Sequence, residues 1–184
     1  VAATAAQRPT AGQCGRLTRR RKRATLCVFA LSLRDVSMSQ PDSLISAAAL
    51  AERIAEKDVA VVEIDQSMSV AYDKAHVPGA LGHDWQPFLW DESAREFPAP
   101  DDFAQRLGAA GIGNETEVVF YGNPLQYGTY AWWVFRYCGH AASFVLDGAL
   151  KAWEQDGNPA TADRATRAPR SYTPRARNES MRAL

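Results

Sequence analysis

The sequence predicts an α/β domain with a mostly parallel central sheet and helices on both faces. Short β-branched or aromatic segments alternate along the chain with amphipathic, helix-forming segments, which is typical of a parallel sheet covered by its crossover helices. The segment Val59–Ile64 is apolar almost throughout, as expected for a strand that is buried on both faces. With 184 residues, the chain is long enough to hold one such domain with a substantial hydrophobic core.

The predicted elements begin at residue 44. Leu44–Ile45 is a short apolar strand, and Ser46 can cap a helix over Ala47–Lys57 by accepting a hydrogen bond from a free backbone N–H group. Asp101–Ala110 is a second amphipathic helix, whose acidic first turn suits the helix dipole. The later elements are a strand at Glu117–Tyr121, an aromatic-rich helix at Gly128–Tyr137, a strand at Ser143–Leu146 and a short helix at Ala149–Gln155.

Charge divides the chain into three parts. Residues 1–37 carry eight Lys and Arg side chains and one acid, and we interpret them as a basic extension that is disordered or not native to the functional protein. A targeting segment is an alternative, because an apolar run follows the basic cluster, and so is a tail that binds nucleic acid or anionic lipid. Residues 38–157 form the predicted domain, and residues 158–184, rich in Arg and Pro, are interpreted as a linker.

Composition disfavours several functions. The predicted domain carries a net charge of −11, which argues against nucleic acid as its partner. The sequence has no run of about 18 apolar residues, so we expect no membrane-spanning helix. Cys14, Cys27 and Cys138 are scattered, without a CxxC pair or the spacing of a zinc site. We therefore expect no metal, no cofactor and no disulfide framework, and the predicted location is the reducing cytoplasm.

One motif lies between the first two long elements, in the segment YDKAHVPGAL. Tyr72 stands four residues before His76, and Pro78 and Gly79 follow in the same turn. Pro78 fixes its own φ angle and Gly79 supplies conformational freedom, so a rigid turn should lead into the next strand. We interpret His76 as a residue that stabilises this turn rather than as a catalytic base.

Two further motifs complete a pattern. VLDGALKAW is a strand, an Asp147-Gly148 turn and a helix that ends at Trp153, and YGNPLQYGTYAWWVFRYCGH covers residues 121–140. In this order and at these separations, the three motifs resemble the two signatures and the active-site loop of the rhodanese family. The resemblance covers residues 44–157 and implies a rhodanese-like fold.

The resemblance also implies a reaction, the transfer of sulfane sulfur from thiosulfate to cyanide or a thiol acceptor. In the family, a cysteine follows the strand that ends near Tyr121, and surrounding backbone N–H groups stabilise its thiolate and then its persulfide. Gly122 occupies this position, so the chain alone has no catalytic residue there and is expected to be inactive. The equivalent of the active-site loop consists of Gly122, Asn123, Pro124, Leu125, Gln126, Tyr127 and Gly128.

A rhodanese-like domain without its cysteine resembles the N-terminal, non-catalytic domain of tandem thiosulfate sulfurtransferases. The implied partner is a second, catalytic rhodanese domain, in cis or as a separate chain, and residues 158–184 would lead toward it. The aromatic side chains of the helix behind the loop suit core packing or such an interdomain contact. These side chains are Trp132, Trp133, Phe135 and Tyr137.

Two other functions stay open at this point. A free-standing pseudo-rhodanese would bind a partner, or would hold an anion with free N–H groups around Gly122. A phosphatase-like relative of the same fold is disfavoured, because it too needs a cysteine nucleophile. Cys138 is predicted to lie at the far end of the helix, buried and inert.

Overall fold

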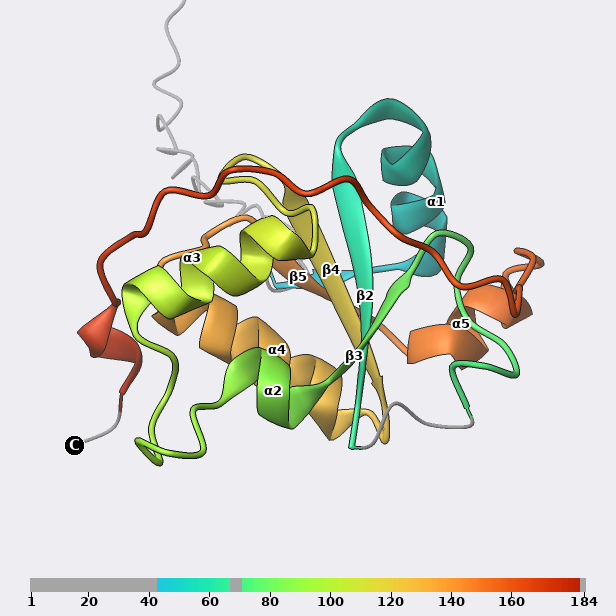
Figure 1. Ribbon diagram of the computed structural model, residues 1–184. Helices are drawn as coiled ribbons and strands as arrows, with labels where there is room; N and C mark the ends of the chain where they lie inside the picture. Colours follow the sequence, from blue (N-terminus) through green and yellow to red (C-terminus); the bar gives the residue numbers. More distant parts are fainter. Residues whose placement is uncertain (1–42, 67–70, 183–184) are drawn as a thin grey trace, which may run out of the picture. The chain divides into compact units, whose positions relative to one another are not determined.

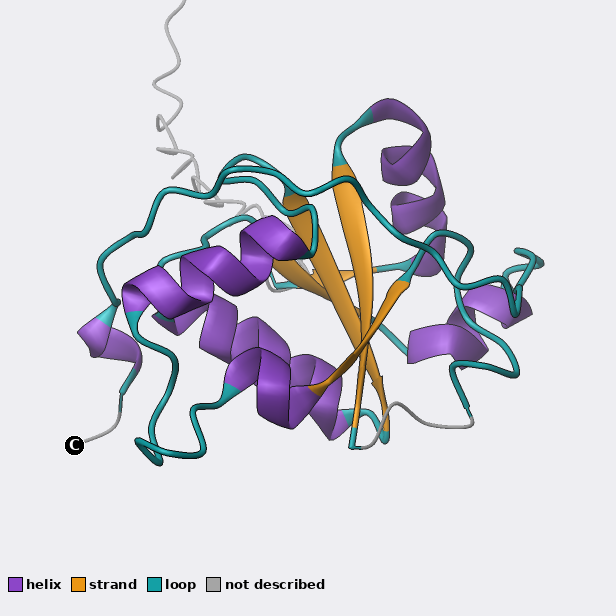
Figure 2. Ribbon diagram, in the orientation of Figure 1, coloured by secondary structure: helices purple, strands orange, loops and turns teal. Residues whose placement is uncertain are grey.

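The computed structural model describes residues 43–66 and 71–182. These residues form a five-stranded, all-parallel sheet in the order β1-β5-β4-β2-β3, with helices on both faces (Figures 1 and 2). The predicted α/β fold class is confirmed. The predicted extension at residues 1–37 lies outside the described residues.

The sheet is built around its two longest strands, β2 (Val59–Asp65) and β4 (Glu117–Asn123). They pair in parallel over seven residues, and every residue of β2 is buried because helices cover both faces. After β2 the chain continues to β3 (Leu81–Asp84) on one side and then crosses to β4 on the other. The carboxyl ends of β2 and β4 therefore form the switch point of the sheet, where open α/β sheets bind ligands.

One face of the sheet is covered by α2 (Trp85–Leu89), α3 (Pro100–Ala109) and α4 (Gln126–Tyr137). Helical spacing places Ala131, Val134 and Phe135 of α4 on its buried side. The Phe135 ring is at the centre of this core, with centroids 4.6 Å from Phe120 and 5.0 Å from Phe103.

The other face is covered by α1 (Ala47–Glu56) and α5 (Ala149–Gln155). As predicted, Ser46 caps α1, and its Oγ accepts a hydrogen bond from the Ala49 N–H at 3.2 Å. Leu50 of α1 and Trp153 of α5 pack against the Val61 side of the sheet. The outer strands on this half are β1 (Leu44–Ile45) and β5 (Ser143–Leu146).

Helix α2 was not among the predicted elements. It is only five residues long and contains Pro87, so its sequence lacks the two turns of apolar periodicity that indicate a helix. Its start is set by Asp84, whose side chain accepts a hydrogen bond from the Gln86 N–H at 3.0 Å. None of the helices within residues 43–66 and 71–182 has both the length and the hydropathy needed to cross a bilayer.

Residues 158–182, which we name the C-terminal segment, lie against the domain although they contain only one short 3-10 helix (Glu179–Met181). Figure 1 shows this segment, in red, running from α5 over the ends of the strands and along α3. The Arg170 N–H donates to the Gly108 carbonyl at 2.9 Å, and the Asn178 N–H donates to the Tyr137 carbonyl at 2.7 Å. Its role as a linker toward a second domain stays a prediction.

Candidate functional site

The connection between β4 and α4 is the position of the predicted active-site loop. The structure differs from the prediction in extent, because β4 continues through Gly122 to Asn123 and α4 begins at Gln126. Only Pro124 and Leu125 lie between them. The helix starts early because the Tyr127 and Gly128 N–H groups donate, both at 3.1 Å, to the carbonyl oxygens of Pro124 and Leu125.

Gly122 has no space for a side chain. A Cβ atom placed on it would lie 2.6 Å from the Gly128 nitrogen, 2.9 Å from the Ile64 carbonyl oxygen and 3.1 Å from the Pro124 carbonyl oxygen. Gly128 is equally restricted, since its Cβ would lie 2.8 Å from the Tyr121 backbone. The two glycines thus allow the first turn of α4 to pack directly on the end of β4. Backbone atoms fill the volume that a cysteine side chain would need.

Two backbone N–H groups of this connection take part in hydrogen bonds. Those of Tyr127 and Gly128 are bonded within the turn, and Gly122 lies in the β2–β4 ladder opposite Ile64. An anion-binding nest requires successive N–H groups that point into open space. The Tyr127 and Gly128 N–H groups therefore point into the turn, and anion binding around Gly122 stays a prediction.

A buried polar pair lies beside Gly122. Glu63 of β2 is 3% exposed, and burial raises the pKa of its carboxyl group. The Tyr121 hydroxyl is hydrogen-bonded to this carboxyl and accepts the Val77 N–H at 3.1 Å, and burial raises the pKa of Tyr121. A cavity of about 360 Å³ adjoins the pair, with Lys74 and Lys151 among its lining residues. Glu63 was not among the predicted site residues, although a single acid inside an apolar strand is a visible signal in the sequence.

The first motif braces a turn. His76 is fully buried, with Nδ1 2.6 Å from the Tyr72 carbonyl oxygen and Nε2 3.0 Å from the Asp163 carbonyl oxygen. Its ring stacks on Tyr72 at 3.9 Å, and the Tyr72 hydroxyl donates to the Ala80 carbonyl at 2.6 Å. Gly79 has a φ of +78°, which explains a glycine at this position. These contacts hold the turn that leads into β3, and the purely structural role of His76 stays a prediction.

The second motif joins β5 to the C-terminal segment. The Asp147 N–H donates to the Ile45 carbonyl at 2.9 Å, and Gly148 adopts a φ of +73° before α5 begins. The Trp153 indole N–H then donates to the Pro159 carbonyl at 2.7 Å. These contacts hold α5 against β5 and the C-terminal segment.

Comparison with known proteins decides the family. Residues 46–156, more than half of the chain, match the family described as the rhodanese-like domain. The chain belongs to the rhodanese family.

The chain is similar to curated proteins named as a sulfur carrier and as thiosulfate sulfurtransferases. The sulfur carrier protein TtuD of Thermus thermophilus is 34% identical over 146 residues, and a Mycobacterium tuberculosis protein classed as a thiosulfate sulfurtransferase is 37% identical over 148 residues. The matches cover 79% and 80% of this chain, but 51% and 53% of the two relatives. The chain thus spans about half the length of the curated relatives it matches.

Solved structures show the same fold. SseA from Escherichia coli, described with the rhodanese fold of 3-mercaptopyruvate sulfotransferases, has a TM-score of 0.65 and 22% identity over 74% of this chain and 56% of its own. The anaerobic ergothioneine biosynthesis enzyme from Chlorobium limicola has a TM-score of 0.62 and 20% identity, over 71% of this chain and 36% of its own. At these identities the likeness concerns the rhodanese fold alone.

Cys138 and Gly122 lie at opposite ends of α4. Cys138 lies at the carboxyl end of α4, whereas Gly122 lies beyond the amino end. Its side chain is 4% exposed, and burial raises the pKa of its thiol to about 11. A reactive thiol needs a lowered pKa and access to substrate. Within the described part of the chain, His, Cys, Asp and Glu form no group of three or more that could hold a metal ion.

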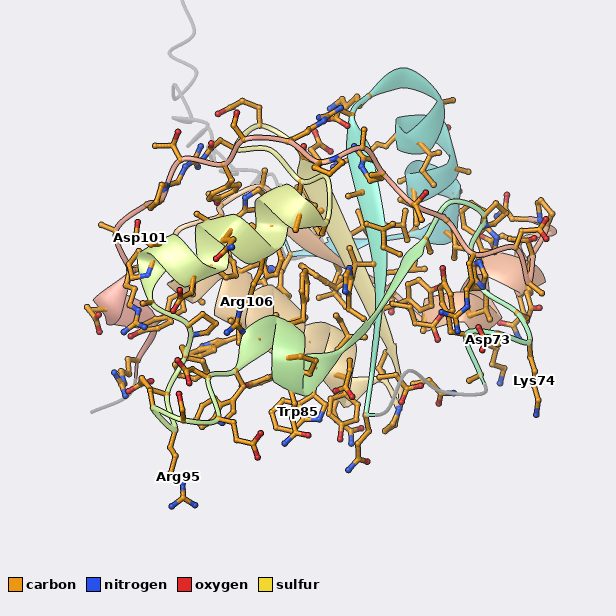
Figure 3. The ribbon with its side chains drawn as sticks, viewed as in Figure 1. Asp73, Lys74, Trp85, Arg95, Asp101 and Arg106 are labelled. Carbon is orange, nitrogen blue, oxygen red and sulfur yellow. The ribbon has the colours of Figure 1, made fainter. Side chains whose placement is uncertain are left out.

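A second, apolar cavity lies between α2 and the first turns of α4. We name it the aromatic groove; its volume is about 530 Å³, and Figure 3 shows one of its residues, Trp85, on the side of α2 away from α3. The groove does not include the aromatic side chains that were predicted for core or interdomain packing. Phe135 and Tyr137 are fully buried, and the Trp132 indole N–H donates to the Ser143 carbonyl at 3.1 Å. The groove is lined by Trp85, Trp90, Gln126, Tyr127 and Tyr130.

His140 offers a test of the packing between the rhodanese core and the C-terminal segment. Its Nε2 donates to the Thr116 carbonyl at 3.0 Å, and its Nδ1 accepts from the Tyr172 hydroxyl at 3.1 Å, an arrangement that requires a neutral ring. Burial lowers the pKa of His140 from 6.5 to about 4. Between these two values the unfolded chain binds a proton that the folded chain does not bind. This group should therefore decrease the free energy of unfolding by about 1–3 kcal/mol as the pH falls from 6.5 to 4.

The deciding measurement is an NMR titration of the imidazole Cε1–H resonances between pH 7.5 and 4. Burial lowers the pKa of His83 to about 4 as well, while the raised pKa of Glu63 acts on stability in the opposite direction. A site-resolved titration separates these groups, with His140→Asn identifying the resonance. A folded-state midpoint near 6.5 for His140 would contradict the expected neutral ring.

Proposed function

We propose that this chain is the N-terminal, non-catalytic domain of a thiosulfate sulfurtransferase. In this proposal a cysteine of a second rhodanese domain performs the reaction. Its thiolate attacks the outer sulfur of thiosulfate and sulfite leaves, which gives a persulfide; cyanide or a thiol acceptor then takes the outer sulfur and regenerates the thiolate.

The observation that carries the proposal is the filled space at Gly122. A Cβ atom there would lie 2.6 Å from the Gly128 nitrogen, so the connection is built to exclude a side chain rather than to hold one. The family supports sulfur transfer as the reaction class. The relatives support a second domain, because the matches leave about half of their length outside this chain.

The proposal is tested by assaying thiocyanate formation from thiosulfate and cyanide. The purified chain should show no activity above the uncatalysed rate, and Cys138→Ser should behave identically because the Cys138 thiol is buried. A longer natural protein that contains this chain should be active, and should lose activity when the cysteine of its second domain is replaced. Activity of the present chain that disappears in Cys138→Ser would refute the proposal.

A further inference from the structure

The aromatic groove has no role in the proposal based on Gly122, so its function is a separate question. The Trp85 ring lies 6.2 Å from the Tyr127 ring in a stacked arrangement and 5.9 Å from the Tyr130 ring in an edge-on arrangement. Four aromatic side chains and one amide thus surround an apolar hollow of about 530 Å³. Aromatic side chains are enriched at the centres of protein interfaces.

Two further observations indicate that a partner covers this surface. The Trp85 indole nitrogen is buried and has no hydrogen-bond partner within the described part of the chain. Leu125, directly before the groove residue Gln126, is 50% exposed. An unpaired buried donor and an exposed leucine beside an apolar hollow are unfavourable unless something else covers them.

We propose that the aromatic groove, with Leu125 at its edge, is the docking surface for the second, cysteine-bearing rhodanese domain. This inference rests on the proposed function and names the surface that the partner contacts. The groove shares Gln126 and Tyr127 with the equivalent of the active-site loop, so a domain docked here lies against the closed β4–α4 connection.

Charge near the groove indicates the chemistry of the partner surface. A neighbouring hollow shares Trp90 with the groove, and its charged lining residues are two acids, Asp91 and Glu92, and one base, Arg106. A partner with an apolar centre and basic residues toward this rim would complement both features. A contact of this kind also agrees with the length of the relatives, of which this chain covers about half.

The experiment uses two matched variants, Leu125→Lys and Ile54→Lys. Both positions are exposed large apolar side chains, at 50% and 37% exposure, but Ile54 lies in α1 on the opposite face of the sheet. The probe is the polypeptide encoded after residue 184, expressed as a separate chain and titrated by calorimetry. We expect Ile54→Lys to bind with the affinity of the unmodified chain and Leu125→Lys to bind at least tenfold more weakly. The Trp85 indole N–H resonance should shift on docking.

The outcomes separate this inference from the proposed function. Equal affinity of both variants, with the unmodified chain still binding, would overturn the docking surface and leave the proposed function standing. Absence of a cysteine-bearing domain after residue 184 would instead overturn the proposed function. Self-association of the present chain that Leu125→Lys abolishes, measured by sedimentation velocity without the probe, would assign the groove to a second copy and overturn the inference. Thermal unfolding of both variants checks that each is folded.

Discussion

Replacing Gly122 by cysteine is expected to destabilise the domain by about 3 kcal/mol and to leave it without sulfurtransferase activity. The added Cβ would lie within 3.1 Å of three backbone atoms, none of which can rotate away as the end of a side chain would. The first turn of α4 would have to move off β4 before a thiol could fit. The cysteine would then lack the ordered N–H groups that stabilise a thiolate.

Gly113 provides the control for this substitution. A Cβ atom on Gly113 would lie 3.7 Å from the Thr116 Oγ1 atom, which is an ordinary contact. Gly113→Ala should therefore change the urea midpoint little, whereas Gly122→Ala should lower it markedly, and Gly122→Cys should form no thiocyanate from thiosulfate and cyanide. A stable and active Gly122→Cys variant would show that the connection opens readily, which would contradict the close packing of Gly122 and Gly128.

Replacing Tyr172 by alanine is expected to lower the free energy of unfolding by about 3–5 kcal/mol, as large-to-small changes of buried aromatic residues do. Tyr172 is 9% exposed, its ring packs edge-on against Phe103 at 6.3 Å, and its hydroxyl donates to His140 Nδ1. The substitution removes the packed ring and also leaves the buried His140 nitrogen without a donor. A loss of this size is a large fraction of the stability of an ordinary domain.

Two variants separate the contributions to this effect. Tyr172→Phe keeps the ring and should cost about 1–3 kcal/mol for the unpaired His140 nitrogen. Thr173→Ala changes an exposed side chain and should be neutral, because the hydrogen bonds of Thr173 to Asn114 use its backbone: the Thr173 N–H donates to Asn114 Oδ1 at 2.8 Å, and the Asn114 side-chain N–H donates to the Thr173 carbonyl at 2.9 Å. Urea unfolding followed by far-UV circular dichroism gives all three values. A neutral Tyr172→Ala would contradict the packing of the Tyr172 ring against Phe103 and its hydrogen bond to His140.

The sequence was sufficient for the positions of the long strands and helices. Val59–Ile64 and Ser143–Leu146 were found because strands buried on both faces are continuously apolar, and the observed elements include these residues. Helix α2 was missed because five residues with an internal proline carry no helical period. The burial of Tyr172 in the C-terminal segment was not predicted, because irregular backbone has no sequence period that would mark its buried residues.

The candidate site was predictable only in part. The position of Gly122 in a motif was enough to predict that a glycine replaces the nucleophile. The close packing around Gly122 was not predictable, because it depends on Gly128, six residues later, and on a carbonyl of the neighbouring strand. Likewise, the aromatic groove combines side chains of α2 and α4, which are distant in sequence. Contacts of this kind arise from the three-dimensional path of the chain, which local sequence patterns do not encode.

The C-terminal segment also determines how the domain would respond to a mechanical load. Its contacts succeed one another along the chain, from Arg182 on Glu96, through Asn178 on the Tyr137 carbonyl, to Arg170 on the Gly108 carbonyl. A force that pulls on residue 182 would break these contacts one after another, before it loaded the hydrogen bonds of the sheet. The C-terminal segment would thus detach first, while the sheet stayed intact.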